Sequence, residues 1–162
     1  MKNIGLVLIL LLLCSCTPVA TYPPVENKTV ANYSKNVNEP VITILAVAFD
    51  YAFNHFGGMD SIVFNLPKGM GKTTYDRVVQ KLQNSSPMTN VDQLAYHVVE
   101  LRVRGFTADL DIFFPTASGK YEMATIHLDS SLISGWGVNR DRVWLVPVNE
   151  IPKPNYPLAS LK

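Results

Sequence analysis

Cysteine is scarce in this chain. Its two cysteines, Cys14 and Cys16, both lie close to the N-terminus. No disulfide can therefore form within the region that follows residue 16, and a domain there depends on its hydrophobic core for stability. Long apolar runs are lacking as well. The aliphatic run over residues 6–13 is much shorter than the ~20 residues that a transmembrane helix needs.

Charge is also limited. Charged residues make up 17% of the chain, and the formal net charge is +1. The arginines form no basic stripe, so nothing in the charge pattern favours a nucleic-acid partner. Sequence patterns of nucleophilic catalysis are missing too, because Gly-x-Ser-x-Gly does not occur. The sequence therefore leans away from an enzyme, and it implies no cofactor.

A positive charge followed by a short aliphatic run is typical of a signal peptide. Lys2 supplies the charge, and the run over residues 6–13 closes with Leu13-Cys14-Ser15-Cys16. This segment resembles the signal peptide of bacterial lipoproteins, which has leucine three places before the cut, a small residue just before it and the acceptor cysteine just after it. Leu13, Ser15 and Cys16 fit these places. The alternative is an ordinary secretory signal with two incidental cysteines.

The lipoprotein resemblance implies that residues 1–15 are removed and that Cys16 carries acyl chains such as palmitate. One chain binds a membrane weakly, but several make a stable anchor. The protein is then expected in the bacterial cell envelope. Thr17, in place of an aspartate, favours the outer membrane with the domain facing the periplasm. The 14 Lys and Arg residues less Lys2 leave 13 basic residues against 13 acidic ones, so the processed chain has no net charge.

Four segments are predicted. Residues 1–15 are the signal peptide, and residues 16–38 are the lipidated cysteine with a flexible tether that is rich in Pro and Asn and has no apolar period. Residues 39–150 form a single α+β domain. Residues 151–162, with three prolines, form an extended C-terminal tail.

The first half of the domain is predicted to be mainly helical. Apolar residues wrap most of a helix that begins near Pro40 and ends before Gly57-Gly58. A short strand follows over residues 60–66. A second helix carries an apolar stripe over residues 75–82, and Thr73 or Thr74 is expected to cap its N-terminus.

The second half is predicted to be β. Residues 100–114 alternate as a hairpin that turns at Gly105-Phe106. This register places Leu101 opposite Leu110, Val103 opposite Ala108, Arg102 opposite Asp109 and Glu100 opposite Asp111. The last pair is unfavourable unless Arg102 bridges it diagonally. Two more strands are expected, at about 120–128 and 138–148, with a loop rich in Ser and Gly between them.

This order of elements predicts N-terminal helices packed on a curved, mainly antiparallel sheet of four to five strands. It resembles the conical α+β fold of nuclear transport factor two, scytalone dehydratase and ketosteroid isomerase, with the final strand running through Trp136 and Trp144. The resemblance implies a pocket at the wide end of the cone, and Asp50 and His55 are the ionisable residues that an enzyme of this kind would use there. A cystatin-like helix on a sheet is the alternative.

Other motifs have simpler interpretations. Residues 69–73 resemble the end of a phosphate-binding P-loop, but Leu66 stands where the first glycine is required. The histidines, His55, His97 and His127, lack metal-ligand spacing. Asp109 and Asp111 share one face of a strand and are expected to form cross-strand salt bridges, although paired carboxylates also serve acid–base or calcium sites. Four aromatic residues are expected in the core or, alternatively, around a ligand pocket: Tyr96, Tyr121, Trp136 and Trp144.

The sequence thus predicts a membrane-anchored envelope lipoprotein that binds a protein partner or assembles a complex without catalysis. The alternative is a small-molecule-binding lipoprotein with a pocket in the curved sheet, and after it a dehydratase-like or isomerase-like enzyme. Cys16 is the one site residue predicted, for lipidation, and no metal is implied.

Overall fold

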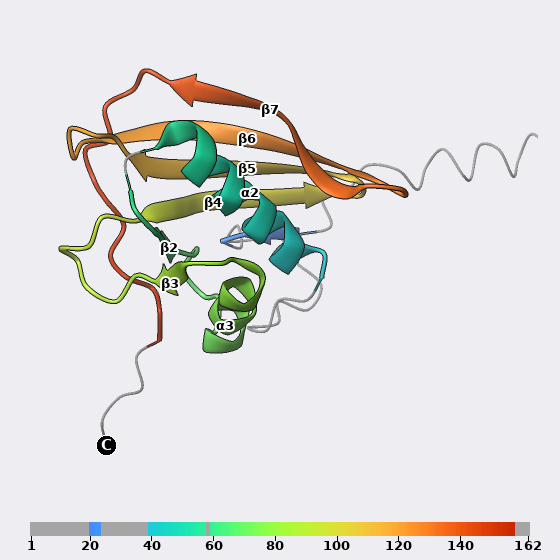
Figure 1. Ribbon diagram of the computed structural model, residues 1–162, viewed down its shortest axis with the longest axis horizontal. Helices are drawn as coiled ribbons and strands as arrows, with labels where there is room; N and C mark the ends of the chain where they lie inside the picture. Colours follow the sequence, from blue (N-terminus) through green and yellow to red (C-terminus); the bar gives the residue numbers. More distant parts are fainter. Residues whose placement is uncertain (1–19, 24–38, 58, 158–162) are drawn as a thin grey trace, which may run out of the picture.

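Two helices and a curved, open sheet of seven strands form the part of the chain that the structure describes (Figure 1). The computed structural model describes residues 20–23, 39–57 and 59–157. The helices are α2 (Val41–Phe56) and α3 (Lys72–Lys81). The strands are β1 (Ala20–Tyr22), β2 (Ile62–Asn65), β3 (Ser85–Pro87), β4 (Tyr96–Arg104), β5 (Thr107–Pro115), β6 (Tyr121–Ser131) and β7 (Gly135–Trp144). The α+β class is confirmed.

The sheet is mixed. Its order is β3-β2-β4-β5-β6-β7, with β1 also paired to β4. Strands β4 to β7 are antiparallel neighbours, whereas β2 is parallel to both β3 and β4. The prediction of four to five strands was wrong, because β1 and β3 have three residues each, too few to show an alternation. Strand β1 also lies inside the segment predicted as a tether. Residues 1–19, with the predicted signal peptide and Cys16, and residues 24–38 are outside the described residues.

Helix α2 crosses one face of the sheet and covers it (Figure 1). It ends at Gly57, whose φ of 68° is positive and favours glycine, although its ψ of −166° differs from that of the left-handed cap that was expected. Six of its residues are fully buried: Ile42, Ile44, Leu45, Ala48, Phe49 and Ala52. Neither described helix is long and apolar enough to span a membrane.

Helix α3 is placed differently from the prediction. It packs against α2 and β3 at the edge of the sheet, so only α2 lies across the antiparallel strands. Gly71 is its N-cap residue and makes no side-chain cap. The expected threonine cap was therefore wrong, and Thr74 is instead fully buried. Tyr75 is the main buried anchor of α3 and stacks on Phe64 with 5.7 Å between ring centroids.

The predicted β4–β5 register is confirmed at all four pairs, including Glu100 opposite Asp111. The next two strands differ from the prediction. Strand β6 continues to Ser131 and β7 begins at Gly135, because serines and glycines expected in a loop pair across the hairpin. Strand β7 also ends at Trp144, whereas the prediction extended it to Val148.

After β7 the chain turns back across the face of the sheet that is opposite α2. Residues 146–150 lie beside Phe113 of β5 and Met123 of β6. Tyr156 then packs edge to face on Tyr75 of α3, with ring centroids 5.1 Å apart. The segment predicted as an extended tail has no helix or strand over residues 151–157, but it docks on the domain.

Replacing Phe49 by alanine tests the core. Phe49 is fully buried and its ring centroid lies 4.9 Å from that of Phe64. The cavity left by Phe49→Ala is expected to lower the free energy of unfolding by about 3–5 kcal/mol in urea denaturation. Phe106→Ala, at a residue that is 70% exposed, is the control and is expected to stay within ~0.5 kcal/mol of the parent. Equal losses in the two variants would contradict the placement of α2.

Candidate functional site

The candidate site lies on the face of the sheet that points away from α2. Side chains alternate between the two faces along each strand. On β5, Leu110 and Ile112 join the core with α2, whereas Asp111 and Phe113 point to the other face. Residues 145–157, which we call the returning chain, cross that face. A groove lies beside the returning chain, and a network of charged side chains lies next to the groove.

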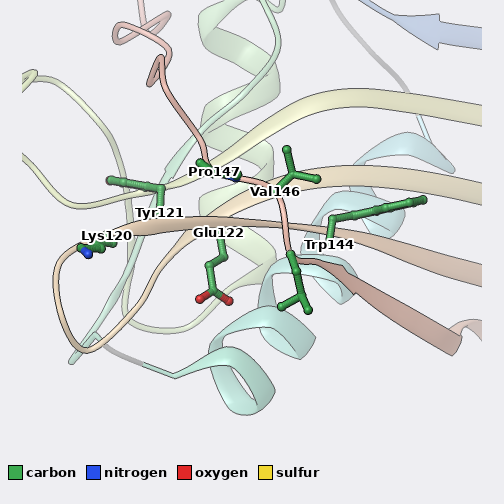
Figure 2. A pocket seen from close by; sticks show the side chains of 7 residues that line it. Lys120, Tyr121, Glu122, Trp144, Val146 and Pro147 are labelled. Atoms are coloured by element: carbon green, nitrogen blue, oxygen red, sulfur yellow. The ribbon is translucent and has the colours of Figure 1, made fainter.

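The groove forms where β7 ends and the chain begins to cross the sheet. We call it the tail groove. It has a volume of about 350 Å³ and is lined by Lys120, Tyr121, Glu122, Trp144, Leu145, Val146 and Pro147. Figure 2 shows Tyr121 and Trp144 on either side of the Val146–Pro147 segment, whereas the side chain of Glu122 points to the opposite side of β6 from Tyr121. A second pocket of about 200 Å³ shares Val146 and Pro147 and reaches Phe113.

Trp144 is held in place by a chain of hydrogen bonds. Its indole Nε1 donates to Oγ1 of Thr125 at 2.9 Å, and that hydroxyl donates to Oδ1 of Asp111 at 2.6 Å. On the ring face, the Arg142 guanidinium carbon lies 4.1 Å from the centroid, which is cation–π geometry. The aromatic wall of the groove is therefore oriented before any ligand arrives.

Arg102 neutralises the two carboxylates that the register brings together. Its Nη1 donates to Oε2 of Glu100 at 2.7 Å and to Oδ2 of Asp111 at 2.8 Å. The hydrogen bond to Asp111 is the main reason that the pKa of Arg102 is raised above its ordinary value. The diagonal bridge that the sequence required is confirmed. Asp109 takes a different partner, because its carboxylate accepts from Nδ1 of His127 at 2.5 Å.

Under the returning chain, both polar atoms of the Asn65 side chain form hydrogen bonds. Nδ2 donates to the carbonyl of Lys153 at 2.8 Å and to Nδ1 of His97 at 3.3 Å. Oδ1 accepts from the backbone N–H of Asn155 at 2.8 Å and from the Tyr75 hydroxyl at 3.2 Å. Four chain segments thus meet at one buried side chain.

His97 is the neutral member of this cluster. It is fully buried, and burial lowers its pKa to about 4. An amide nitrogen can only donate, so Nδ1 of His97 accepts from Asn65 and Nε2 carries the hydrogen. Nε2 has no hydrogen-bond partner among the described residues. Tyr121, which lines the tail groove, packs edge to face on the His97 ring at 5.4 Å. The cluster therefore adjoins the groove.

Of the four aromatic residues considered for a pocket, Tyr121 and Trp144 line the tail groove. Tyr96 is fully buried, and Trp136 packs against the core. Two of the four residues therefore line a groove, on the opposite face of the sheet from the expected interior.

The other candidates do not form a site. Asp50 and His55 are exposed on α2 and line neither the tail groove nor the second pocket. Within residues 20–23, 39–57 and 59–157, no group of His, Cys, Asp and Glu is able to hold a metal ion. In the P-loop-like segment, Lys72 pairs with Asp76 at 2.7 Å. Cys16 lies outside the described residues.

Three residues of the site had no signal in the sequence that we recognised. Asn65 resembles an ordinary strand end, and its role depends on the returning chain. Leu145 and Val146 continue the apolar pattern of β7, yet they leave the sheet and are 96% and 58% exposed. The sign available was Pro147, since proline disfavours a continued strand.

Comparisons with protein-family models, curated proteins and solved structures found no match to this chain. The interpretation of the site therefore depends on its own geometry. An open, largely apolar groove with a fixed tryptophan and opposite charges on Lys120 and Glu122 is suited to binding. It does not pair a base with a nucleophile.

The pH dependence of stability tests the His97 cluster. Burial lowers the pKa of His97 from 6.5 to about 4, so between these values the unfolded chain binds a proton that the folded protein does not. The contribution of neutral His97 to the free energy of unfolding is therefore complete above pH ~6.5 and is lost as the pH falls toward ~4. The total loss is about 3 kcal/mol. Urea denaturation of the parent across this range should therefore show stability falling with acidification.

His97→Gln is expected to lose this part of the slope, whatever its stability at neutral pH. His55→Gln, which removes an exposed imidazole, is the matched control. The assignment to His97 fails when the slope of His97→Gln equals that of the parent, or when both variants lose it together.

Proposed function

We propose that this chain is a lipid-anchored protein of the bacterial cell envelope that binds a protein partner through the tail groove without catalysis. The anchor is supported by Lys2, the aliphatic run over residues 6–13 and the Leu13-Cys14-Ser15-Cys16 sequence. Within this proposal, residues 1–15 are removed and Cys16 carries the lipid. Thr17 favours the outer membrane, with the domain in the periplasm.

The observation that carries the binding proposal is the contrast between the two faces of the sheet. On the α2 side, Ile42, Leu45 and Phe49 are fully buried, so helix side chains occupy the space that a conical fold would offer a ligand. On the other side, Leu145 and Val146 are exposed next to the fixed ring of Trp144. Exposed apolar residues that gather beside an oriented aromatic ring are typical of a surface for a partner.

A small molecule in the tail groove is the second candidate. A volume of about 350 Å³ lies at the lower end of the range for ligand sites, roughly 300–1,000 Å³. Such sites bury most of the ligand, whereas Leu145, at 96% exposure, leaves one wall of this groove facing solvent. The open wall favours a partner that brings its own surface to cover Leu145.

Metabolic labelling with an alkyne fatty acid tests the anchor in bacterial cells. The full chain is expected to take up label and to float with membranes, and Cys16→Ala is expected to lose both properties. Cys14→Ala is the matched control, since it removes the neighbouring thiol two places earlier and should keep the label. Label that survives in Cys16→Ala, or disappears equally in Cys14→Ala, would refute Cys16 as the acceptor.

Site-specific crosslinking tests the groove. A photoreactive amino acid at Leu145 in the full chain is expected to give a discrete adduct with one envelope protein in the native cells. Val146→Asp is expected to abolish that adduct, because a carboxylate in the apolar contact must be desolvated. The control position is Val91, which is 62% exposed and is not among the residues that line the groove. The same adducts at both positions, or none at Leu145, would count against the proposal.

A further inference from the structure

Two neighbouring hairpin tips carry exposed apolar side chains. The β4–β5 turn holds Phe106, which is 70% exposed, and the β6–β7 turn holds Leu132 and Ile133, at 97% and 100%. Strands β4 to β7 are antiparallel neighbours, so both turns lie at the same end of the sheet (Figure 1). The backbone N–H of Ser130 donates to the carbonyl of Phe106 at 2.7 Å, which holds the two tips together. We call Phe106, Leu132 and Ile133 the apolar tip.

The turn chemistry does not require these residues. In the β6–β7 turn, the backbone N–H of Ser134 donates to Oγ of Ser131 at 2.9 Å, and Gly135 takes a φ of 69°. Serine and glycine thus close the turn, and Leu132 and Ile133 occupy the places between them, where polar residues are usual. The β5–β6 turn at the other end shows the ordinary pattern, with Thr116 bonded to Ser118 and Lys120.

The chain enters the sheet at the same end as the apolar tip. Strand β1 is antiparallel to β4 and pairs Ala20 with Val103, three residues before Phe106. Cys16 precedes Ala20 by four residues, which a fully extended chain covers in at most about 14 Å. A lipid on Cys16 therefore brings this end of the sheet to the membrane.

The opposite end holds the tail groove. Lys120 directly precedes β6, Tyr121 begins it and Trp144 ends β7, so the groove and the apolar tip lie at opposite ends of the same strands. Arg104, exposed at the end of β4, adds a cation that suits phosphate headgroups beside the tip. One end of the sheet thus fits a lipid surface while the other stays free for a partner.

We propose that Phe106, Leu132 and Ile133 insert into the bilayer interface next to the lipid on Cys16 and set the domain upright, with the tail groove facing away from the membrane. The inference rests on the proposed lipid anchor for its geometry. The occupant of the apolar tip is the lipid bilayer itself, not a protein.

The full chain is produced in bacteria, purified after processing and reconstituted in vesicles of phosphatidylethanolamine and phosphatidylglycerol. Leu132→Cys carries an environment-sensitive fluorophore, and Ser118→Cys, in the β5–β6 turn, carries the same probe as the matched control. When Cys14 has been removed and Cys16 acylated, the new thiol is the sole labelling site. The probe at 132 is expected to shift to the blue, to lose quenching by aqueous iodide and to be quenched by nitroxide lipids. The probe at 118 should behave as in water.

A second variant shows whether the tip causes the insertion. Phe106→Ser with Ile133→Ser is expected to return the probe at 132 to the emission seen in water. Val91→Ser with Leu94→Ser, which removes exposed apolar side chains outside the tip, should leave it shifted. Urea denaturation confirms that both double variants fold.

Water-like emission at both 132 and 118 overturns the inference. So does shielding of the probe at 132 from iodide without quenching by nitroxide lipids, since a protein contact then covers the tip. Mass spectrometry of the processed chain decides the anchor separately. An unacylated Cys16 refutes the lipid anchor, and the tip is then tested with Cys16→Ser in the same chain, so that the probe reports on residue 132 alone and its quenching by nitroxide lipids supports insertion.

Discussion

The amide of Asn65 is the point on which the arrangement of the chain depends. It is buried, and each of its four hydrogen-bonding positions is used by a different partner: the carbonyl of Lys153, the ring of His97, the N–H of Asn155 and the hydroxyl of Tyr75. These groups belong to the returning chain, β4 and α3. Burial keeps both ionisable partners neutral, because it raises the pKa of Tyr75 and lowers that of His97. An aspartate at this place would bring a buried charge with no cation to meet it.

The tail groove follows from that interaction. The returning chain has no helix or strand of its own to hold it, so its course over Phe113 and Met123 is set by where it starts, at Trp144, and by where it is tied, at Asn65. Trp144 is fixed in turn by Thr125 and, through it, by Asp111 and Arg102. The groove is therefore shaped by polar contacts at both ends, although its lining is largely apolar.

Local patterns predicted the parts of the fold that depend on neighbours in the sequence. The alternation over residues 100–114 was enough to give the β4–β5 register and to show that Arg102 had to lie between Glu100 and Asp111. The pair Gly57-Gly58 likewise predicted where α2 ends. Strands β1 and β3 were missed because three residues show no period, and the parallel pairing of β2 depends on contacts between distant segments. The groove was missed for the same reason, since no local signal shows that residues 145–157 return across the sheet.

In the lipid-anchored protein that we propose, the pairing of β1 with β4 would limit how far the domain can move from its anchor. A tether of some twenty flexible residues would let a domain sweep a hemisphere above its anchor. Here only residues 17–19 separate Cys16 from a strand inside the sheet, so an anchored domain would have a short lever arm and little freedom to tilt. The anchored domain would then diffuse only in the plane of the membrane. A partner would have to present its binding surface at the distance from the bilayer at which the tail groove is held.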